Sequence, residues 1–367
     1  MSGIGNFAQG LYSGRVSYNF VERRKLWYTV SGIILAITLG SLIFRGLNLG
    51  IEFKGGSEFQ VPQASCSVDQ AQQATNSVAE GQAVVTVLGD GTLRIQTQNV
   101  TPAESDQVTR ALGEACDVKP ADIKIQLVGP TWGSDVSKKA LQGLIVFLIL
   151  VTIFLSIYFE WKMAIAALVA LAHDLIITLG LYSLLGFEVT PATAIGVLTI
   201  LGYSLYDTVV VFDKVKENTR GVLGQSRLTY AEAANLAVNQ TLIRSINTSI
   251  VALLPVGAIL FVGAGLLGAG TLKDLALALF VGMAAGTYSS ICVATPLLAQ
   301  LKDREPEVQA LKRRVEARRK NTEDSEGGDG APAATAAAVS GLGDSRSVTE
   351  SSVRQQPRRS SRSKRKR

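Results

Sequence analysis

The sequence has few of the residues from which metal and redox sites are built. It contains three cysteines and one histidine in 367 residues, and the cysteines fit no metal-binding or redox spacing. Cys292 lies in an apolar block and is expected to be inert. Cys66 and Cys116 lie in the one large polar segment, and they could pair if that segment faces an oxidising compartment. A metal site is therefore not expected.

Three further patterns are missing. The N-terminus lacks the small-residue pattern of a signal-peptide cleavage site and the first apolar block is long, so no cleavable signal is expected. No internal repeat is obvious, so the chain could be one half of a pseudo-symmetric pair. Gly55-Gly56 lacks the Gly-x-x-x-x-Gly-Lys-Ser/Thr pattern of a phosphate loop. This glycine pair is expected to bend the backbone where the first apolar block leads into a sheet.

Apolar residues are abundant and unevenly distributed. They make up 47% of the chain, the mean hydropathy is +0.26, and they fall in long blocks. Such blocks predict a polytopic α-helical membrane protein with six transmembrane helices. The helices are expected within residues 26–47, 140–159, 163–185, 191–212, 241–262 and 276–298.

The basic residues indicate which way the spans run. Residues 22–25, the loop at 213–240 and the tail at 301–367 are rich in Lys and Arg, whereas the links at 186–190 and 263–274 are nearly uncharged. The positive-inside rule then predicts cytoplasmic termini, 1–25 and 301–367, in the cell membrane.

The tail is expected to be a charged helix at 302–320 followed by disordered chain with a polybasic end. Its expected partner is anionic lipid, and RNA or ribosome is the alternative.

Residues 48–138 form the large polar segment, between the first and second spans. The pattern predicts strands at 50–61, 83–88, 92–98 and 123–128, helices at 67–79 and 101–113, and a hairpin turn at Gly89-Asp90-Gly91. The order strand, helix, strand, strand, helix, strand predicts a small extracytoplasmic α+β domain of the ferredoxin-like kind. It contains no catalytic constellation.

The fourth span carries a carboxylate, Asp207, well inside the apolar block. A charge at the centre of a membrane helix costs about 2.5–3.5 kcal/mol on insertion scales, so a function is expected to maintain it. Residues three or four apart share one helix face. The predicted polar stripe is Thr193, Gly196, Thr199 or Ile200, Tyr203 and Asp207.

Two other charged positions accompany Asp207 in the apolar blocks. Arg244, near the start of the fifth span, can supply a permanent cation, and a carboxylate balanced between burial and a cation can bind and release a proton. The alternative is a static ion pair. His173-Asp174 in the third span is a second candidate, with a structural hydrogen-bonded pair as the alternative. Further side chains that could line a water path, or only satisfy helix contacts, are Tyr203, Ser204, Thr208 and Asn247.

Several motifs taken together resemble the SecF family over about residues 20–300. They are LGIEFKGG at 49–56, Ala172-His173-Asp174, GYSLYDTVVVFD at 202–213, Lys216-Glu217-Asn218 and NQTLIRSINTS at 239–249. The sequence departs from the family at Glu52, where Asp is usual, and in its basic tail, which lies outside the common core.

The resemblance implies a membrane subunit of the bacterial preprotein translocase that works with SecD beside the SecYEG channel. Family members are related to the resistance-nodulation-division transporters and use the proton motive force to draw unfolded preprotein from the channel. Asp207 and Arg244 match the residues tied to proton movement. SecA, YajC and YidC are implied as further partners through the complex. No cofactor is expected besides protons as the coupling ion.

Three other functions remain open on sequence alone. The chain could stabilise the channel complex without moving protons. Asp174 and Asp207 could form an intramembrane aspartyl protease, although the Gly-x-Gly-Asp motif is absent. A drug or lipid exporter of the same superfamily usually has about twice as many spans, so this chain would have to dimerise.

Overall fold

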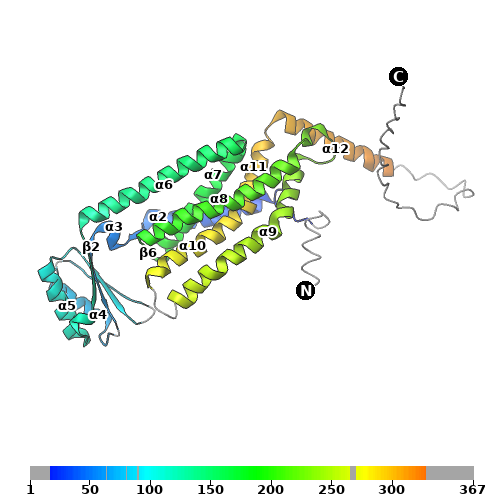
Figure 1. The fold of residues 1–367 in the computed structure, drawn as a ribbon. Coiled ribbons are helices and arrows are strands. Elements are labelled where there is room, and N and C mark those ends of the chain that lie inside the picture. The colour runs from blue at the N-terminus through cyan, green and yellow to red at the C-terminus, as the bar shows by residue number, and fades with distance from the viewer. Residues whose placement is uncertain (1–16, 63, 80, 89–90, 265–269, 328–367) are drawn as a thin grey trace, which may run out of the picture. The chain divides into compact units, whose positions relative to one another are not determined.

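The fold is known from a computed structural model, which describes residues 17–327 apart from 63, 80, 89–90 and 265–269 (Figure 1). Met1–Arg318 form one compact unit and Arg319–Arg367 a second. The predicted turn residues Gly89 and Asp90 lie outside the described residues, as do residues 1–16 and the part of the predicted tail from 328 onward.

Six helices in the described part of the chain are long and apolar enough to cross a membrane, as predicted. They are α2 (Arg24–Phe44), α6 (Pro130–Tyr158), α7 (Trp161–Leu185), α8 (Pro191–Thr219), α9 (Tyr230–Ala258) and α10 (Gly270–Ser289). The π-helical segment η3 (Ile259–Ala264) extends α9, while η4 (Ser290–Ala294) and α11 (Thr295–Lys302) extend α10. A break at 303–305 precedes α12 (Pro306–Gly327).

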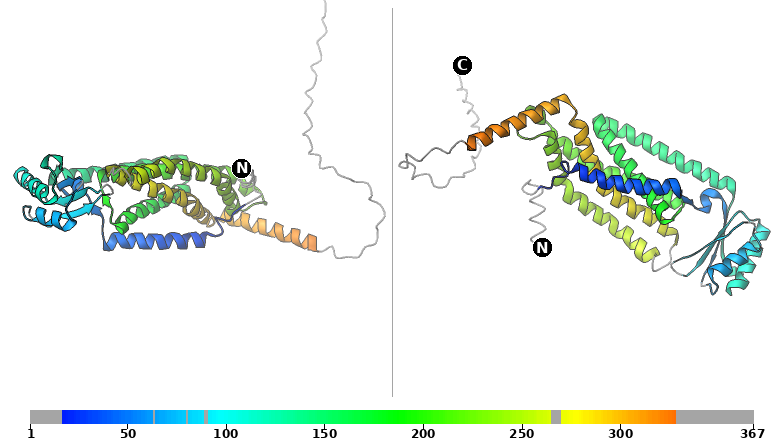
Figure 2. Two further views of the ribbon diagram at one scale, coloured as in Figure 1. Left: turned by 90° about the horizontal axis from the view of Figure 1, so that it is seen from below. Right: turned by 180° about the vertical axis from the view of Figure 1, so that it is seen from behind.

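The helices divide into an inner and an outer group. In the most apolar windows of α7, α8 and α10, the buried share is 50%, 50% and 61%, compared with 17%, 11% and 11% for α2, α6 and α9. The exposed side chains of the outer helices are largely Leu, Ile, Val and Phe, a surface suited to hydrocarbon. Figure 2 shows α2 along one side of the bundle. Polar side chains held by the inner helices are therefore removed from lipid.

Close packing of α10 on α8 depends on two glycines. A Cβ added to Gly282 would lie 2.3 Å from Cδ1 of Ile200, and one added to Gly286 would lie 2.8 Å from Cβ of Ser204. Gly282, Gly286 and Ser290 recur at every fourth position of this span, and they thus form a contact face of small residues. It brings the end of α10 against the middle of α8.

The polar segment folds into a four-stranded antiparallel sheet with two helices on one face. Its elements are α3 (Ile51–Lys54), β2 (Gly56–Val61), α4 (Val68–Asn76), β3 (Val84–Val87), β4 (Leu93–Thr97), α5 (Pro102–Cys116), η1 (Pro120–Asp122) and β5 (Lys124–Val128). The strand order is β3-β4-β2-β5. After α3, the succession strand, helix, strand, strand, helix, strand matches the predicted ferredoxin-like order.

The start of this domain differs from the prediction. Residues 50–61 were expected to form one strand, whereas a helical turn occupies Ile51–Lys54 and the strand begins at Gly56. Gly55 and Gly56 separate the two because their φ angles are +78° and +149°, values that favour glycine. The predicted bend at the glycine pair is therefore confirmed, and it ends a helical turn.

A disulfide joins Cys66 to Cys116, a pairing that the sequence left open. It connects the segment before α4 to the end of α5, with the two Cα atoms 4.4 Å apart. Cys116 is fully buried in the core of the small domain, which also contains Phe59, Ile95 and Leu112. The disulfide therefore closes one side of a packed core.

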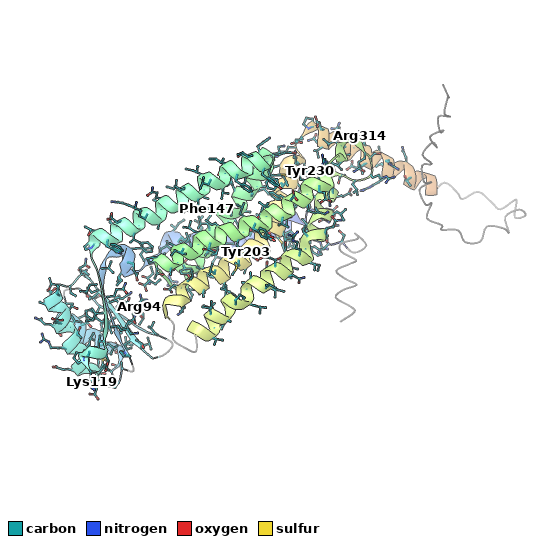
Figure 3. The ribbon with its side chains drawn as sticks, viewed as in Figure 1. Arg94, Lys119, Phe147, Tyr203, Tyr230 and Arg314 are labelled. Carbon is teal, nitrogen blue, oxygen red and sulfur yellow. A yellow bond between two sulfur atoms is a disulfide. The ribbon has the colours of Figure 1, made fainter. Side chains whose placement is uncertain are left out.

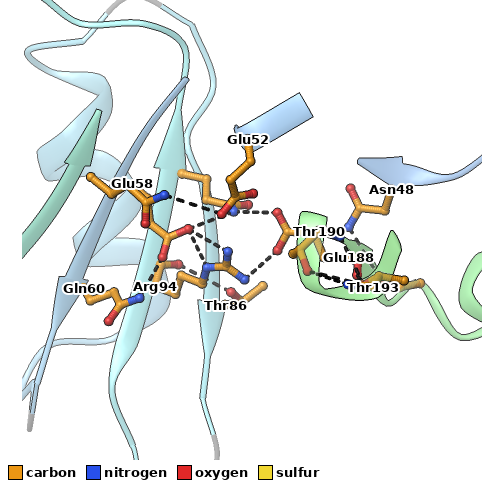
Figure 4. A network of polar contacts seen from close by, with 12 residues as sticks. Asn48, Glu52, Glu58, Gln60, Thr86, Arg94, Glu188, Thr190 and Thr193 are labelled. Atoms are coloured by element: carbon orange, nitrogen blue, oxygen red, sulfur yellow. Dashed lines mark hydrogen bonds and ion pairs between the residues drawn. The ribbon is translucent and has the colours of Figure 1, made fainter. Parts of the chain in front are cut away.

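The open face of the sheet, opposite α4 and α5, contacts the loop before α8 through Arg94 and Gln96 (Figure 4). Arg94 on β4 pairs with Glu58 on β2 at 2.6 Å and with Glu188, which precedes α8, at 2.5 Å. Gln96 donates to Glu188 at 2.8 Å and to Glu58 at 3.2 Å. A short parallel pairing between β1 (Asn48–Leu49) and β6 (Glu188–Val189) also connects the start of the small domain to the segment before α8. The domain is thus attached to the loop from which α8 starts.

Candidate functional site

Asp207 is buried inside the bundle, with 5% of its surface exposed. The Ser245 hydroxyl on α9 donates to Oδ1 at 2.7 Å. The Ser290 hydroxyl, at the start of η4, donates to Oδ2. Three segments far apart in the sequence therefore converge on one carboxylate, and both of these donors are neutral hydroxyls.

The predicted polar stripe on α8 is found, with Ile200 rather than Thr199 as its middle member. Thr193, Gly196, Ile200 and Asp207 are buried, whereas Thr199 is exposed. The 3-and-4 spacing keeps these positions on the face that α10 covers. Helix packing thus positions Asp207 toward the interior of the bundle.

A second buried carboxylate lies on α7. Asp174 is 1% exposed and accepts a hydrogen bond from Ser204 of α8 at 2.5 Å and from Ser289 of α10 at 2.8 Å, both on Oδ2. His173 Nδ1 lies 3.0 Å from Oδ1. All of these partners of the Asp174 carboxyl lie within this chain.

Two consecutive serines serve the two carboxylates. Ser289, the last residue of α10, donates to Asp174, and Ser290, the first residue of η4, donates to Asp207. Both serines are fully buried. π-Helical turns inside α-helices occur frequently at functional sites. Here the turn presents adjacent hydroxyls to carboxylates on two different helices, which links the sites.

Arg244 does not supply the cation that the sequence predicted next to Asp207. Its side chain is exposed, while the next residue, Ser245, is buried against the carboxylate. Adjacent helix residues point about 100° apart, so only one of the two can face Asp207. Among the described residues, no Lys or Arg forms an ion pair with Asp207. An internal Asp207–Arg244 ion pair is therefore absent from this conformation.

The remaining candidate residues occupy different environments. Tyr203, in the middle of the bundle in Figure 3, donates from its hydroxyl to Ser249 Oγ at 3.4 Å, and Ser249 Oγ lies 2.6 Å from Thr287 Oγ1. Thr208 is buried next to Asp207, whereas Asn247 is exposed. Asn247 therefore does not line an internal path. The described residues hold no group of three His, Cys, Asp or Glu side chains that could bind a metal ion.

Comparison with known proteins shows the family. The model of the protein export membrane protein SecD/SecF, C-terminal, matches residues 108–304, and the SecD/SecF GG motif matches residues 40–62. The chain is 53% identical to the protein translocase subunit SecF of Streptomyces coelicolor, over 87% of this chain and 86% of that protein. The chain belongs to the SecF family. A second SecF, from Mycobacterium tuberculosis H37Rv, is 46% identical over 86% of this chain and 74% of its own length.

Solved structures of SecDF share the fold. The crystal structure of SecDF from Thermus thermophilus has a TM-score of 0.71 and 30% identity, covering 79% of this chain and 39% of that chain. SecDF in a super-membrane-facing form has a TM-score of 0.57 and 29% identity, covering 85% and 40%. This SecF chain thus corresponds to about two-fifths of a SecDF chain.

The geometry of the two carboxylates argues against a protease dyad in this SecF. An aspartyl dyad holds its carboxyls close enough to share one proton. Asp174 and Asp207 instead have separate donors, Ser204 and Ser289 for one and Ser245 and Ser290 for the other. The sequence signalled Asp207 and Asp174 through the cost of charge in an apolar block. It gave no comparable signal for Ser245, Ser289 or Ser290, because neutral serine is common in membrane helices.

Proposed function

We propose that this SecF subunit of the protein-export machinery uses the proton motive force, and that Asp207 binds and releases the coupling proton. The proposal rests on a carboxylate that is buried among membrane helices and bonded by two hydroxyls. Protonation removes the cost of a buried charge, which is about 2.5–3.5 kcal/mol on insertion scales. Hydroxyl partners suit both states, because they donate to a carboxylate and accept from a carboxylic acid.

The energy available from the membrane potential is similar to the energy needed to ionise a buried carboxylate. Moving one charge through the membrane potential is worth about 2.3 kcal/mol per 100 mV. This is similar to the cost of ionising a carboxylate at the centre of a span. A change in the protonation of Asp207 can therefore alter how α8 packs against α9 and α10, whose serines bond it.

We propose SecD as the partner that covers the exposed side of α8. Thr199, Gly202 and Tyr206 recur along this side at helical spacing, and an added Cβ at Gly202 would meet nothing within 4 Å. Arg244 on α9 is also exposed. Small and polar residues in membrane helices typically contact protein. A relative from Thermus thermophilus is named SecDF, and this chain covers 40% of it, which leaves length for a second subunit.

Exposed Arg244 keeps a role in this proposal. A guanidinium stays charged, and on the outside of α9 it can meet an acidic group of SecD. Arg244 would then act across the subunit interface, either by attracting a proton-carrying carboxylate or by approaching Asp207 in another conformation of the complex.

The small domain is proposed to lie on the extracytoplasmic side, with both termini in the cytoplasm. The disulfide between Cys66 and Cys116 suits an oxidising compartment. The basic segments at 22–25 and 213–240 lie at the other end of the spans, in accord with the positive-inside rule. On that side the domain can contact preprotein leaving the SecYEG channel. SecA, YajC and YidC remain proposed partners through the complex, and anionic lipid remains the proposed partner of the basic tail.

The proposal is tested by export into inverted membrane vesicles under an imposed proton gradient. Asp207→Asn and Arg244→Met are expected to abolish the gradient-dependent part of export, and Asp213→Asn is expected to leave it intact. Asp213 is a matched control, because it is an exposed carboxylate on the same helix. Each variant is purified with SecD to confirm assembly. If both site variants still respond to the gradient, SecF stabilises the channel complex and does not move protons.

A further inference from the structure

The only histidine of the chain is buried in a membrane helix. His173 on α7 is 4% exposed. Its Nδ1 faces Asp174 at 3.0 Å. Its Nε2 is buried as well, and within the described residues it makes no hydrogen bond. Buried polar atoms without a partner are rare, and each calls for an explanation.

The surroundings of Asp174 determine the form of the imidazole ring. Ser204 and Ser289 both donate to Oδ2, which leaves Oδ1 to accept from the ring. With Asp174 ionised, the neutral ring donates through Nδ1–H, and Nε2 keeps a lone pair. His173 is therefore a base in a buried site, held in one tautomer by a carboxylate.

The groups that face this pair leave Nε2 available. The Tyr288 ring of α10 lies 6.1 Å from the imidazole between centroids, at 29° between planes, and its hydroxyl bonds Ser31 of α2 at 2.9 Å. Cys292 lies near Tyr288. Asp207 is connected to this pair through consecutive residues, since Ser289 donates to Asp174 and Ser290 donates to Asp207.

We propose that His173 and Asp174 form a second proton-binding site, coupled to Asp207 through Ser289 and Ser290. The inference deepens the proton-coupling role proposed above and rests on it. The incoming proton binds Nε2, and the ring becomes an imidazolium that still donates Nδ1–H to the Asp174 carboxylate. The charge of the pair changes from −1 to 0. Release reverses this single step, and no other bond forms or breaks.

The coupling follows from the serine pair. A hydrogen bond to a carboxylate is roughly twice as strong as one between neutral groups. When Asp207 takes up a proton, Ser290 loses this strong acceptor, and the π-turn can shift. Ser289 is the preceding residue and bonds Asp174, so the shift alters the second site. Binding free energies coupled in this way act reciprocally.

The test observes the histidine directly. The full-length chain is purified with SecD in lipid nanodiscs after labelling with ¹⁵N-histidine, and the His173 signal is identified by its loss in His173→Gln. If the second site binds a proton, the signal changes from the neutral Nδ1–H tautomer to the imidazolium when the pH is lowered. In Asp207→Asn the midpoint of this change should shift, because Ser290 no longer donates to a charged acceptor and the π-turn next to Ser289 can move. A signal that stays in one neutral form throughout overturns the second site.

Two variants separate the coupling from simple proximity. Ser290→Ala is expected to abolish the effect of Asp207→Asn on the His173 midpoint, whereas Ser156→Ala, at an exposed serine of α6 that bonds the Thr152 carbonyl, should leave it unchanged. A titrating His173 that ignores Asp207→Asn overturns the coupling. Failure of the proposed function has a different readout, the export assay, in which gradient-dependent export would persist in Asp207→Asn. His173→Gln is expected to lower gradient-dependent export at least tenfold without preventing assembly with SecD.

Discussion

Serine hydroxyls are the direct partners of both buried carboxylates, so single hydroxyl deletions should be measurable. Ser245→Ala removes one of the two donors to Asp207. A buried acceptor that loses its donor costs about 1–3 kcal/mol. We therefore expect a lower thermal unfolding midpoint for the SecD complex, and recovery in Ser245→Thr. Ser156→Ala is the control, and an equal loss in that variant would contradict a specific role for Ser245.

The carboxyl of Glu52 should make the stability of the small domain depend on pH. Burial is the largest effect and raises its pKa. A backbone hydrogen bond opposes the rise, and the nearby carboxylates of Glu188 and Glu58 add to it. A raised pKa in the folded state contributes stability at low pH that is lost as pH rises through the folded pKa. Glu52→Gln should therefore be more stable than wild type at neutral pH, and the difference should vanish in acid.

Thermal unfolding measured from acidic to neutral pH tests this expectation. Glu104 provides a control of opposite sign, because hydrogen bonds from Thr101 lower its pKa. Its contribution is present above the unfolded pKa and is lost as pH falls through the folded value. Identical pH profiles for wild type and Glu52→Gln would show that Glu52 is solvated in the assembled protein.

Among single residues, the sequence predicted the side chains that are costly to bury in a membrane span, and it did not predict those that are buried at little cost. Asp207 and Asp174 could be predicted because a carboxylate in an apolar block must be explained. Ser245 and Ser290 carry no such penalty, so nothing in the sequence marked them as partners of a carboxylate. The ion pair expected between Arg244 and Asp207 is absent from this conformation for a geometric reason, since the neighbouring Ser245 takes the face toward Asp207.

Among elements, the contact between α8 and α10 positions both carboxylates. Gly282→Ala places a methyl group 2.3 Å from Cδ1 of Ile200, which forces the helices apart. Overpacking of this kind costs about 1–3 kcal/mol. We expect loss of thermal stability and of gradient-dependent export, because Ser289 and Ser290 move away from Asp174 and Asp207.

Gly202→Ala is the matched control for this substitution. It adds the same methyl group on α8, where nothing lies within 4 Å. Alanine is also the better helix former by about 1 kcal/mol. The control variant should keep or gain stability when SecF is studied without SecD. Equal damage from both variants would argue against the helix contact as the cause.

The success of sequence reasoning also varied between elements. Six spans were predictable because hydrophobic length is a direct physical requirement of the bilayer. The π-turn at Ser290–Ala294 was not, because one extra residue in a turn leaves the composition unchanged. The helical turn at Ile51–Lys54 was missed for a related reason. Four residues carry too little periodicity to separate a turn of helix from the start of a strand.

At the scale of the whole molecule, Arg94 holds the small domain on the helical bundle (Figure 4). Glu58 is 3% exposed, and Arg94→Gln would leave it without its cation. Breaking a buried pair by removing one partner costs about 3–5 kcal/mol. We expect faster hydrogen exchange in β2 and β4, and a broader distribution of distances between spin labels on the domain and on α8. Arg110→Gln on the exposed side of α5 is the control.

Restoring the balance of charge should restore part of this attachment. In Arg94→Gln combined with Glu58→Gln and Glu188→Gln, neither carboxylate is left without its cation, and the amides can still hydrogen-bond. The distance distribution should narrow again relative to the single variant. Unchanged distances in Arg94→Gln itself would mean that the β1–β6 pairing suffices to hold the domain.

The place where the domain is fastened has a mechanical consequence. Glu188 and Val189 lie directly before α8, and Asp207 lies on that helix about 25 Å away at 1.5 Å per residue. A rigid rod of this length converts a tilt of about 10° at the carboxylate into a displacement of about 4 Å at the far end. Arg94 and the pairing of β1 with β6 would transmit this displacement to the sheet. The connection between the small domain and the start of α8 would therefore transmit a movement at Asp207 to the sheet, as the proposed proton-coupled function requires.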